Sequence, residues 1–178
     1  MSCYERQNNQ AAAIELLPFS QQREAASRWQ NLERSLSNTG LSNSWLWTKT
    51  WLDNYNGIVQ PVFAFGKQGD QLIGAALITK ATEGIRGIPI PAVYLGTAGE
   101  PRIETTKVQY NRLLVAPENL DTFATGLICT LQQQFRWCQL RLDGFVPEHA
   151  AFQAQAEGRD LAGVARVGVR VREGDARV

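Results

Sequence analysis

The segment from Asn43 to Gly57 constrains the fold more than any other part of this chain. It holds three of the five tryptophans, together with Tyr55. Trp47, Trp51 and Tyr55 follow one another at intervals of four residues, so they line one face of a helix. A neighbouring face carries Leu41, Trp45 and Leu52. This apolar arc is wider than a surface helix needs, so we expect the helix to lie between a sheet and a second element.

A second amphipathic helix is predicted just before this segment, from Gln21 to Ser37. Its apolar residues recur at spacings of three and four, at Ala25, Trp29, Leu32 and Leu36. A short strand at Ile14 to Leu17 precedes it, and Gly40 follows it at a position suited to a left-handed cap. The chain therefore begins with a strand and two helices.

The middle of the chain has the composition of strands. Two apolar runs, Val59 to Gly66 and Gln71 to Lys80, flank the turn KQGD and predict a β-hairpin. The next extended run, Gly84 to Gly96, contains Pro89 and Pro91, so we interpret it as an edge strand or a strand-like loop. The hairpin predicts an antiparallel part of a sheet.

The second half of the chain alternates between strand and helix patterns. The expected elements are a strand at Val108 to Pro117, a helix at Leu120 to Phe135, a strand at Trp137 to Gly144 and a helix at Glu148 to Glu157. With the first half, this order predicts an α/β or α+β domain with a mixed central sheet flanked by helices.

The two ends of the chain differ from the domain between them. Residues 1–13 are polar and expected to be loose, and residues 14–158 form the domain. Residues 159–178 consist mostly of Arg, Val, Gly and Ala, and their composition is atypical of the rest. Two interpretations of this tail stay open: a terminal strand formed by the alternating run VGVRVR, or a segment foreign to the original reading frame.

Composition excludes several classes of function. A formal net charge of +1, with basic residues scattered along the chain, gives no field for nucleic acid. A disulfide framework or zinc site is not expected from the only cysteines and histidine, Cys3, Cys129, Cys138 and His149. The chain has no apolar run long enough to span a membrane and no secretory signal at its start, so we expect a cytoplasmic protein.

A series of short motifs points to a family. They are the aromatic helix with Ser44, Trp45 and Trp51, the strand LIGAALI (Leu72 to Ile78), the run Tyr94, Leu95 and Gly96, the pair Tyr110 and Asn111, and Trp137. Over residues 14–158 the chain resembles the N-terminal half of CelD/BcsL-type acetyltransferase-like proteins, which are associated with cellulose biosynthesis and related to FemAB. The resemblance implies a GNAT-like fold and acetyl-CoA as the acyl donor. It also implies two GNAT-like halves, of which the second binds CoA.

Acetyl transfer to an amine needs free backbone amides for the CoA pyrophosphate, an N–H for the oxyanion and a base for the amine proton. The superfamily's phosphate motif matches at Gln71, Gly74 and Ala76, but these residues open a strand, whose amides are engaged in the ladder. The turn at Ala116 to Asn119 has the right place in the order of elements, yet it lacks glycine and contains Glu118. We therefore expect this domain to shape the acceptor side of a cleft without binding CoA itself.

Candidate site residues each have a structural and a functional interpretation. Trp47 and Trp51 pack in the core or line an acceptor pocket, and Tyr110 and Asn111 form a buried pair or face a substrate. A loop with Glu100, Arg102 and Glu104 is solvated surface or an acceptor loop. No catalytic residue stands out.

Other functions stay open at this point. The acceptor would be a small molecule or a sugar or peptide amine, and an exposed apolar face would allow self-association. The alternatives are a non-catalytic interaction or scaffolding domain with the same fold, and a self-contained acetyltransferase.

Overall fold

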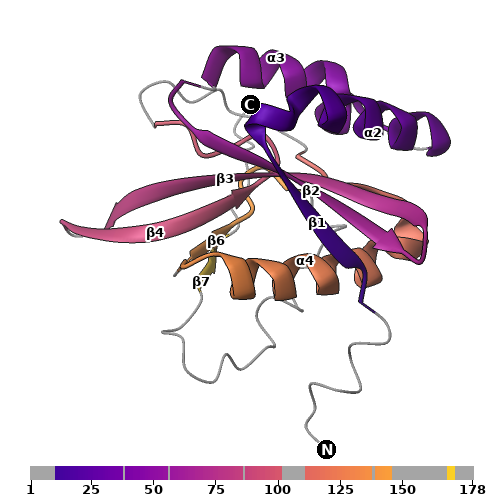
Figure 1. Ribbon diagram of the computed structural model, residues 1–178. Coiled ribbons are helices and arrows are strands. Elements are labelled where there is room, and N and C mark those ends of the chain that lie inside the picture. Colours follow the sequence, from indigo (N-terminus) through magenta and orange to yellow (C-terminus); the bar gives the residue numbers. More distant parts are fainter. Residues whose placement is uncertain are drawn as a thin grey trace, which may run out of the picture.

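The computed structural model describes residues 11–37, 39–55, 57–85, 87–101, 111–137, 139–145 and 168–170. These residues contain seven strands and three α-helices (Figure 1). The strands are β1 (Ala13–Pro18), β2 (Gln60–Gln68), β3 (Gln71–Ile85), β4 (Ile88–Leu95), β5 (Leu114–Val115), β6 (Gln139–Arg141) and β7 (Gly168–Arg170). The helices are α2 (Gln22–Ser35), α3 (Trp45–Tyr55) and α4 (Leu120–Gln134).

All seven strands belong to one mixed sheet. Six of them follow the order β1-β2-β3-β4-β6-β7, and β5 pairs with β3. Neighbours from β1 to β4 are antiparallel, whereas β6 runs parallel to β4 and β7 runs parallel to β6. The predicted mixed sheet with flanking helices is therefore confirmed.

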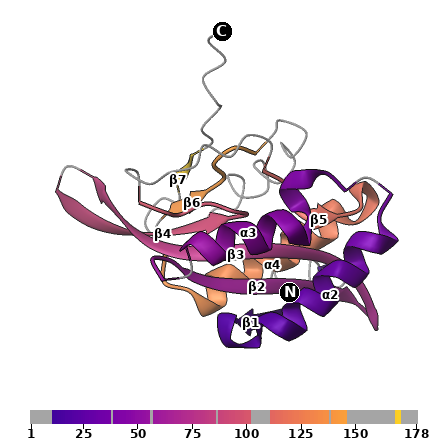
Figure 2. The same cartoon turned by 90° about the horizontal axis from the view of Figure 1, so that it is seen from above.

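The helices cover opposite faces of the sheet. α2 and α3 lie on one face and α4 on the other (Figures 1 and 2). On the first face, the Trp45 ring lies 6.1 Å from the Phe63 ring of β2 and 6.2 Å from the Trp29 ring of α2. The aromatic helix thus packs against both a sheet and a second helix, as its wide apolar arc predicts.

On the other face, α4 presses the ring of Phe123 onto the sheet where glycines leave room. A Cβ atom at Gly66 of β2 would lie 2.4 Å from this ring, and one at Gly74 of β3 would lie 2.7 Å away. Because such distances are too short for real atoms, both positions need glycine. Gly74, part of the apparent phosphate motif, therefore has a packing role in the β2–β3 ladder.

The segment after β3 departs from the prediction. β3 continues to Ile85 instead of ending near Lys80, and only the later part of the predicted run, Ile88–Leu95, forms β4. β4 pairs with β3 over its full length and with β6 at Ala92 to Tyr94, so the prediction of an edge strand or loop is wrong for its second half. Pro89 and Pro91 did not prevent the pairing of β4 with β6, because β6 pairs with β4 only beyond Pro91.

β4 and β5 pair with the same edge of β3, one after the other, so together they form one strand line that is interrupted between Leu95 and Leu114. Ile78 of β3 pairs with Leu95, and Ala75 of β3 pairs with Leu114. Three residues along β3 thus correspond to nineteen along its neighbour, so sixteen residues loop out of a single strand line. An isolated parallel bridge between Asn111 and Phe145 marks the point where the chain rejoins this line.

Several predicted elements match within a few residues: the first strand, the three helices and the β2–β3 hairpin. β7 lies within the VGVRVR run of the tail, where alternation favours a strand. The alternative interpretation, that residues 159–178 are foreign to the original reading frame, stays a prediction. The helix predicted at 148–157, the loose N-terminus at 1–10, and Cys3, Cys138 and His149 lie outside the described residues.

Candidate functional site

The two candidate tryptophans of α3 lie in different surroundings. Trp51 is 3% exposed, and its ring lies 5.1 Å from that of Tyr55. Trp47 is half-buried, and its Nε1 donates a hydrogen bond of 2.9 Å to Oγ1 of Thr97. Trp51 is thus a core residue, whereas Trp47 fastens α3 to the start of the looped-out segment.

Asn111 joins three strand ends where the strand line is interrupted. Its side chain is fully buried, and Nδ2 donates to the carbonyl oxygens of Leu95 and Asp143, each at 3.3 Å. Its backbone N–H donates to the carbonyl of Gly144 at 2.7 Å. Gly96 makes room: its φ is +76°, and a Cβ there would lie 2.2 Å from Asn111 Oδ1. The buried interpretation of Asn111 therefore fits its surroundings; Tyr110 lies outside the described residues.

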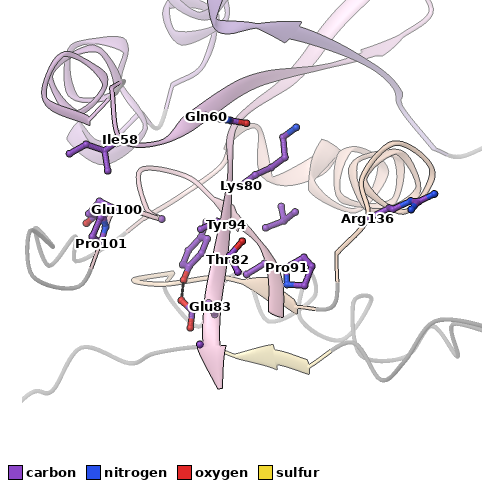
Figure 3. A pocket seen from close by; sticks show the side chains of 15 residues that line it. Ile58, Gln60, Lys80, Thr82, Glu83, Pro91, Tyr94, Glu100, Pro101 and Arg136 are labelled. Carbon is purple, nitrogen blue, oxygen red and sulfur yellow. Dashed lines mark hydrogen bonds between the residues drawn. The ribbon is translucent and has the colours of Figure 1, made fainter. Parts of the chain in front are cut away.

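A hollow of about 780 Å³ surrounds the projecting part of the β3–β4 hairpin. We call this part, residues 80–94, the arm. Lining residues come from both faces of the arm (Figure 3). Glu83, Tyr94 and Glu100 lie on one side, and Lys80 and Arg136 lie on the other. We call these the acidic side and the basic side of the hollow.

On the acidic side, Tyr94 holds a carboxylate in place. Its hydroxyl donates a hydrogen bond to Oε1 of Glu83, drawn as a dashed line in Figure 3. Burial, and then this hydrogen bond, raises the pKa of Tyr94 above its ordinary value. The phenol therefore stays protonated at neutral pH and keeps donating to Glu83.

The loop that carries Glu100 is packed closely against β3. Oγ1 of the buried Thr79 donates to the carbonyl of Ala98. Gly99 follows with a φ of +104°, and a Cβ there would lie 2.4 Å from that Oγ1. This close approach brings Glu100 to the same hollow as Tyr94. Glu100 thus lines the hollow, and both interpretations of its loop stay open, whereas Arg102 and Glu104 lie outside the described residues.

The basic side of the hollow is more exposed. Nζ of Lys80 lies 5.0 Å from the centre of the Phe135 ring, which follows α4. Arg136, the next residue, also lines the hollow. Gln60, at the start of β2, pairs with Lys80 in the sheet. This side presents two cations at the end of α4.

Behind Tyr94 lies a row of polar residues on β6 and just after it. Arg141 is 2% exposed, its guanidinium lies 5.7 Å from the Tyr94 ring, and its Nε lies 3.4 Å from Oδ1 of Asp143. Nη2 of Arg141 also donates a hydrogen bond of 3.5 Å to Oδ2 of Asp143, whereas Nη1 of Arg141 and Oε1 of Gln139 have no hydrogen-bond partner among the described residues. None of these residues was predicted from the sequence as part of a site. The alternation of polar residues with Leu in QLRLD was the available signal.

The start of α4 does not present a phosphate cradle. A 3-10 turn at Pro117–Asn119 precedes the helix. In this turn the N–H of Asn119 donates to Ala116 at 3.0 Å, and the N–H of Leu120 donates to Pro117. Proline has no N–H, and Glu118 adds a negative charge to the first turn. An anion would meet engaged amides and a carboxylate here.

Among the described residues, no group of three or more His, Cys, Asp or Glu side chains is arranged to hold a metal ion. None of the helices in the described ranges combines the length and the hydropathy needed to cross a bilayer. No protein-family model, curated protein or solved structure matches this chain.

Proposed function

We propose that this chain is an N-acyltransferase-like domain with a GNAT-like fold, which forms the acceptor side of an acyl-transfer cleft. The observation that carries the proposal is the connectivity of the sheet. A strand, two helices and an antiparallel set are followed by a β–α–β unit, in which α4 connects β5 to β6. This is the order of elements expected from the resemblance to acetyltransferase-like proteins.

The strand line changes partners at a point suited to a ligand site. β4 and β6 pair in parallel, and the chain beyond them makes one further parallel contact, the bridge between Asn111 and Phe145. Beyond it, among the described residues, Leu114 and Val115 pair with β3 alone. In open sheets, ligands bind beyond the carboxyl ends of parallel strands where the connectivity changes. The looped-out segment that brings Glu100 to the hollow leaves the sheet beside this point.

The acidic side of the hollow has the chemistry of an amine acceptor site. Glu83 and Glu100 provide two carboxylates, which attract an ammonium group. A carboxylate can also accept the proton that an amine loses when it attacks a thioester. Tyr94 fixes Glu83 through its hydroxyl, so one carboxylate is oriented before the amine arrives. The proposed acceptor is therefore a primary amine.

The donor side is proposed to come from another domain. Because the start of α4 presents engaged amides and Glu118, this chain has no evident place for the CoA pyrophosphate within its described residues. The same observation favours a second candidate function, a non-catalytic interaction domain that keeps this fold. The two candidates differ in whether the acidic side binds an amine.

Thermal unfolding with two ligands tests the proposal. A ligand at ten times its Kd stabilises a folded protein by about 1.4 kcal/mol, which raises the Tm of a domain of this size by about 3–6 °C. We expect this rise with N-acetyl-lysine amide and none with millimolar acetyl-CoA. The matched control ligand is N-acetyl-norleucine amide, which lacks the amine. The matched control protein is E83Q, which should lose the response.

Each alternative gives a different result in this experiment. No response to either ligand would leave the interaction domain as the better description. A response to acetyl-CoA would instead indicate a self-contained acetyltransferase. W47A should lower the Tm because it removes the contact with Thr97, and it should leave amine affinity within about twofold. A large loss of amine affinity in W47A would place Trp47 in the acceptor site.

A further inference from the structure

We propose that the outer edge of β3, from Ala81 to Ile85, binds an extended peptide as an added strand whose side chains alternate between basic and acidic. This inference goes beyond the proposed function and stands without it. It rests on a sheet edge that opens into the hollow and on the opposite charges of the hollow's two sides.

Among the strands that the structure describes, none covers this edge over a defined stretch. β2 pairs with β3 only as far as the pair Gln60 and Lys80, whereas β4 pairs with β3 up to Ile85. Among the described residues, no strand pairs with the β2-facing edge of β3 after Lys80. Ala81, Thr82, Glu83 and Gly84 also line the hollow, so this edge faces an open space. An added strand would continue the line of β2.

Prolines show which backbone groups face this space. In an antiparallel pair, opposite residues either exchange both hydrogen bonds or direct them outward. Pro91 lies opposite Thr82 and Pro89 lies opposite Gly84, and neither proline can donate to β3. Thr82 and Gly84 therefore direct their N–H and C=O groups away from β4, towards the free edge. Pro61, opposite Thr79 on the β2 side, fits the same alternation.

The charges around the edge select the pattern of the peptide. Side chains of an added strand alternate between the two faces of the sheet. One face presents Glu83 and Glu100, and the other presents Lys80 and Arg136 (Figure 3). A peptide with basic residues on the first face and acidic residues on the second meets opposite charges on both. Strand addition uses main-chain hydrogen bonds for affinity and alternate side chains for specificity.

A second copy of this chain fits the edge less well. If two arms paired through their β3 edges, each copy would bring its own Glu83 onto a face of the other arm. An antiparallel pairing centred near this residue would place like charges side by side, which is destabilising. The occupant is therefore a different, charge-alternating peptide.

Fluorescence anisotropy with a labelled peptide tests this proposal. The probe is a hexapeptide of alternating Lys and Glu, and the matched control is its isomer with three Lys followed by three Glu. We expect the alternating peptide to bind at least about tenfold more tightly, because only it pairs opposite charges on both faces. Equal affinity for the two isomers would overturn the proposal.

Two substitutions at Thr82 distinguish a role of its backbone N–H in peptide binding from a role of its side chain. T82P removes the N–H that faces the free edge and should abolish binding, whereas T82A keeps the backbone and should bind within about threefold of the wild type. A proline can also distort the arm, so a peptide N-methylated at alternate amides gives a second test on the unchanged protein. Methylation of the amides facing β3 should abolish binding, and methylation of the other set should not.

Two results would contradict strand addition. The first is binding that survives both T82P and methylation of the β3-facing amides. The second is a dimer of the free protein that T82P dissociates, which would assign this edge to a second copy. Failure of the amine test with N-acetyl-lysine amide would leave this inference intact, so the two proposals fail separately.

Discussion

Between the helix pair α2–α3 and helix α4, the sheet carries apolar side chains on both faces, whereas around the arm polar side chains lie beside a small apolar cluster of Ala92, Tyr94 and Ala98. Two separate clusters of buried apolar residues flank the first region. Its polar groups include the Trp29 indole, which donates to the carbonyl of Asn43 at 3.0 Å. The arm region instead places Tyr94, Arg141 and Asp143 side by side. Buried polar groups without full hydrogen bonding cost stability, so their concentration in one region indicates a role beyond holding the fold.

The largest effect is expected in the apolar region. F123A would remove a fully buried ring that fills the space above Gly66 and Gly74. The lost burial and the cavity should lower the free energy of unfolding by about 3–5 kcal/mol. Urea unfolding followed by tryptophan fluorescence measures this loss. A cost below about 1 kcal/mol would show that α4 repacks freely, which would contradict the tight packing of this region.

A slightly smaller effect is expected from the buried charge in the arm region. D143A removes the carboxylate that faces Arg141 and leaves a buried guanidinium uncompensated, so it should cost about 3 kcal/mol. The matched variant R141M replaces the cation with an apolar side chain of similar length. Because Asp143 is 28% exposed and can be hydrated, R141M should change stability by less than about 1 kcal/mol.

These two variants sharpen the comparison when unfolded in parallel. If R141M costs more than D143A, Arg141 stabilises the sheet by itself, and the polar row is structural. If R141M is neutral and the amine response is lost, the row supports the acidic side of the hollow. Thermal unfolding with and without N-acetyl-lysine amide gives both readings.

Y94F tests whether the Tyr94 hydroxyl positions Glu83 on the acidic side of the hollow. It removes one hydroxyl, and with it the hydrogen bond to Glu83, while it keeps the ring against Arg141. The expected loss of stability is about 0.5–1.5 kcal/mol. Amine binding should weaken because Glu83 is no longer held. Isothermal titration with unchanged amine affinity would show that Glu83 needs no positioning.

The smallest effect concerns an ion-pair cluster on the helical side. Hydrogen bonds from Arg28 and then Lys67 lower the pKa of Glu15 from 4.5 to about 2. A carboxylate with a lowered pKa contributes stability above pH 4.5, and this contribution is lost as the pH falls through about 2. The side chain is 37% exposed, so the contribution should be below about 1 kcal/mol.

E15Q is the control for this pH dependence. Its unfolding free energy should be below that of the wild type at pH 6, and the two should converge near pH 2. Denaturant unfolding at a series of pH values measures both curves. Parallel curves over this range would show that Glu15 is not linked to folding.

The sequence predicted the helical region better than the arm. Helical periodicity placed α2 and α3, and the width of the aromatic arc predicted that α3 contacts two elements. The arm was harder to predict because Pro89 and Pro91 indicate a broken strand, and their tolerance depends on which edge β6 occupies. Periodicity within one segment contains no information about the partner strand.

The candidate site was predictable only in part. Glu100 was singled out from its loop, but its proximity to Tyr94 depends on the packing of Thr79 against Ala98. Asn111 was singled out as a polar residue in an apolar strand, and its buried environment fits one of the two interpretations given to it. The polar row of β6 was readable from alternation alone. Its burial was not, because burial depends on neighbouring strands.

The chain between Leu95 and Leu114 is sixteen residues longer than a continuous strand needs, which makes this position a suitable insertion site for protein engineering. Both ends of the excursion are fixed by the sheet and by Asn111, so the length between them is set by neither strand. Doubling the length of a flexible loop costs only about 0.6 kcal/mol in closure entropy. A reporter tag or a foreign epitope inserted between Pro101 and Asn111 should therefore leave the register of β4 and β5 on β3 unchanged.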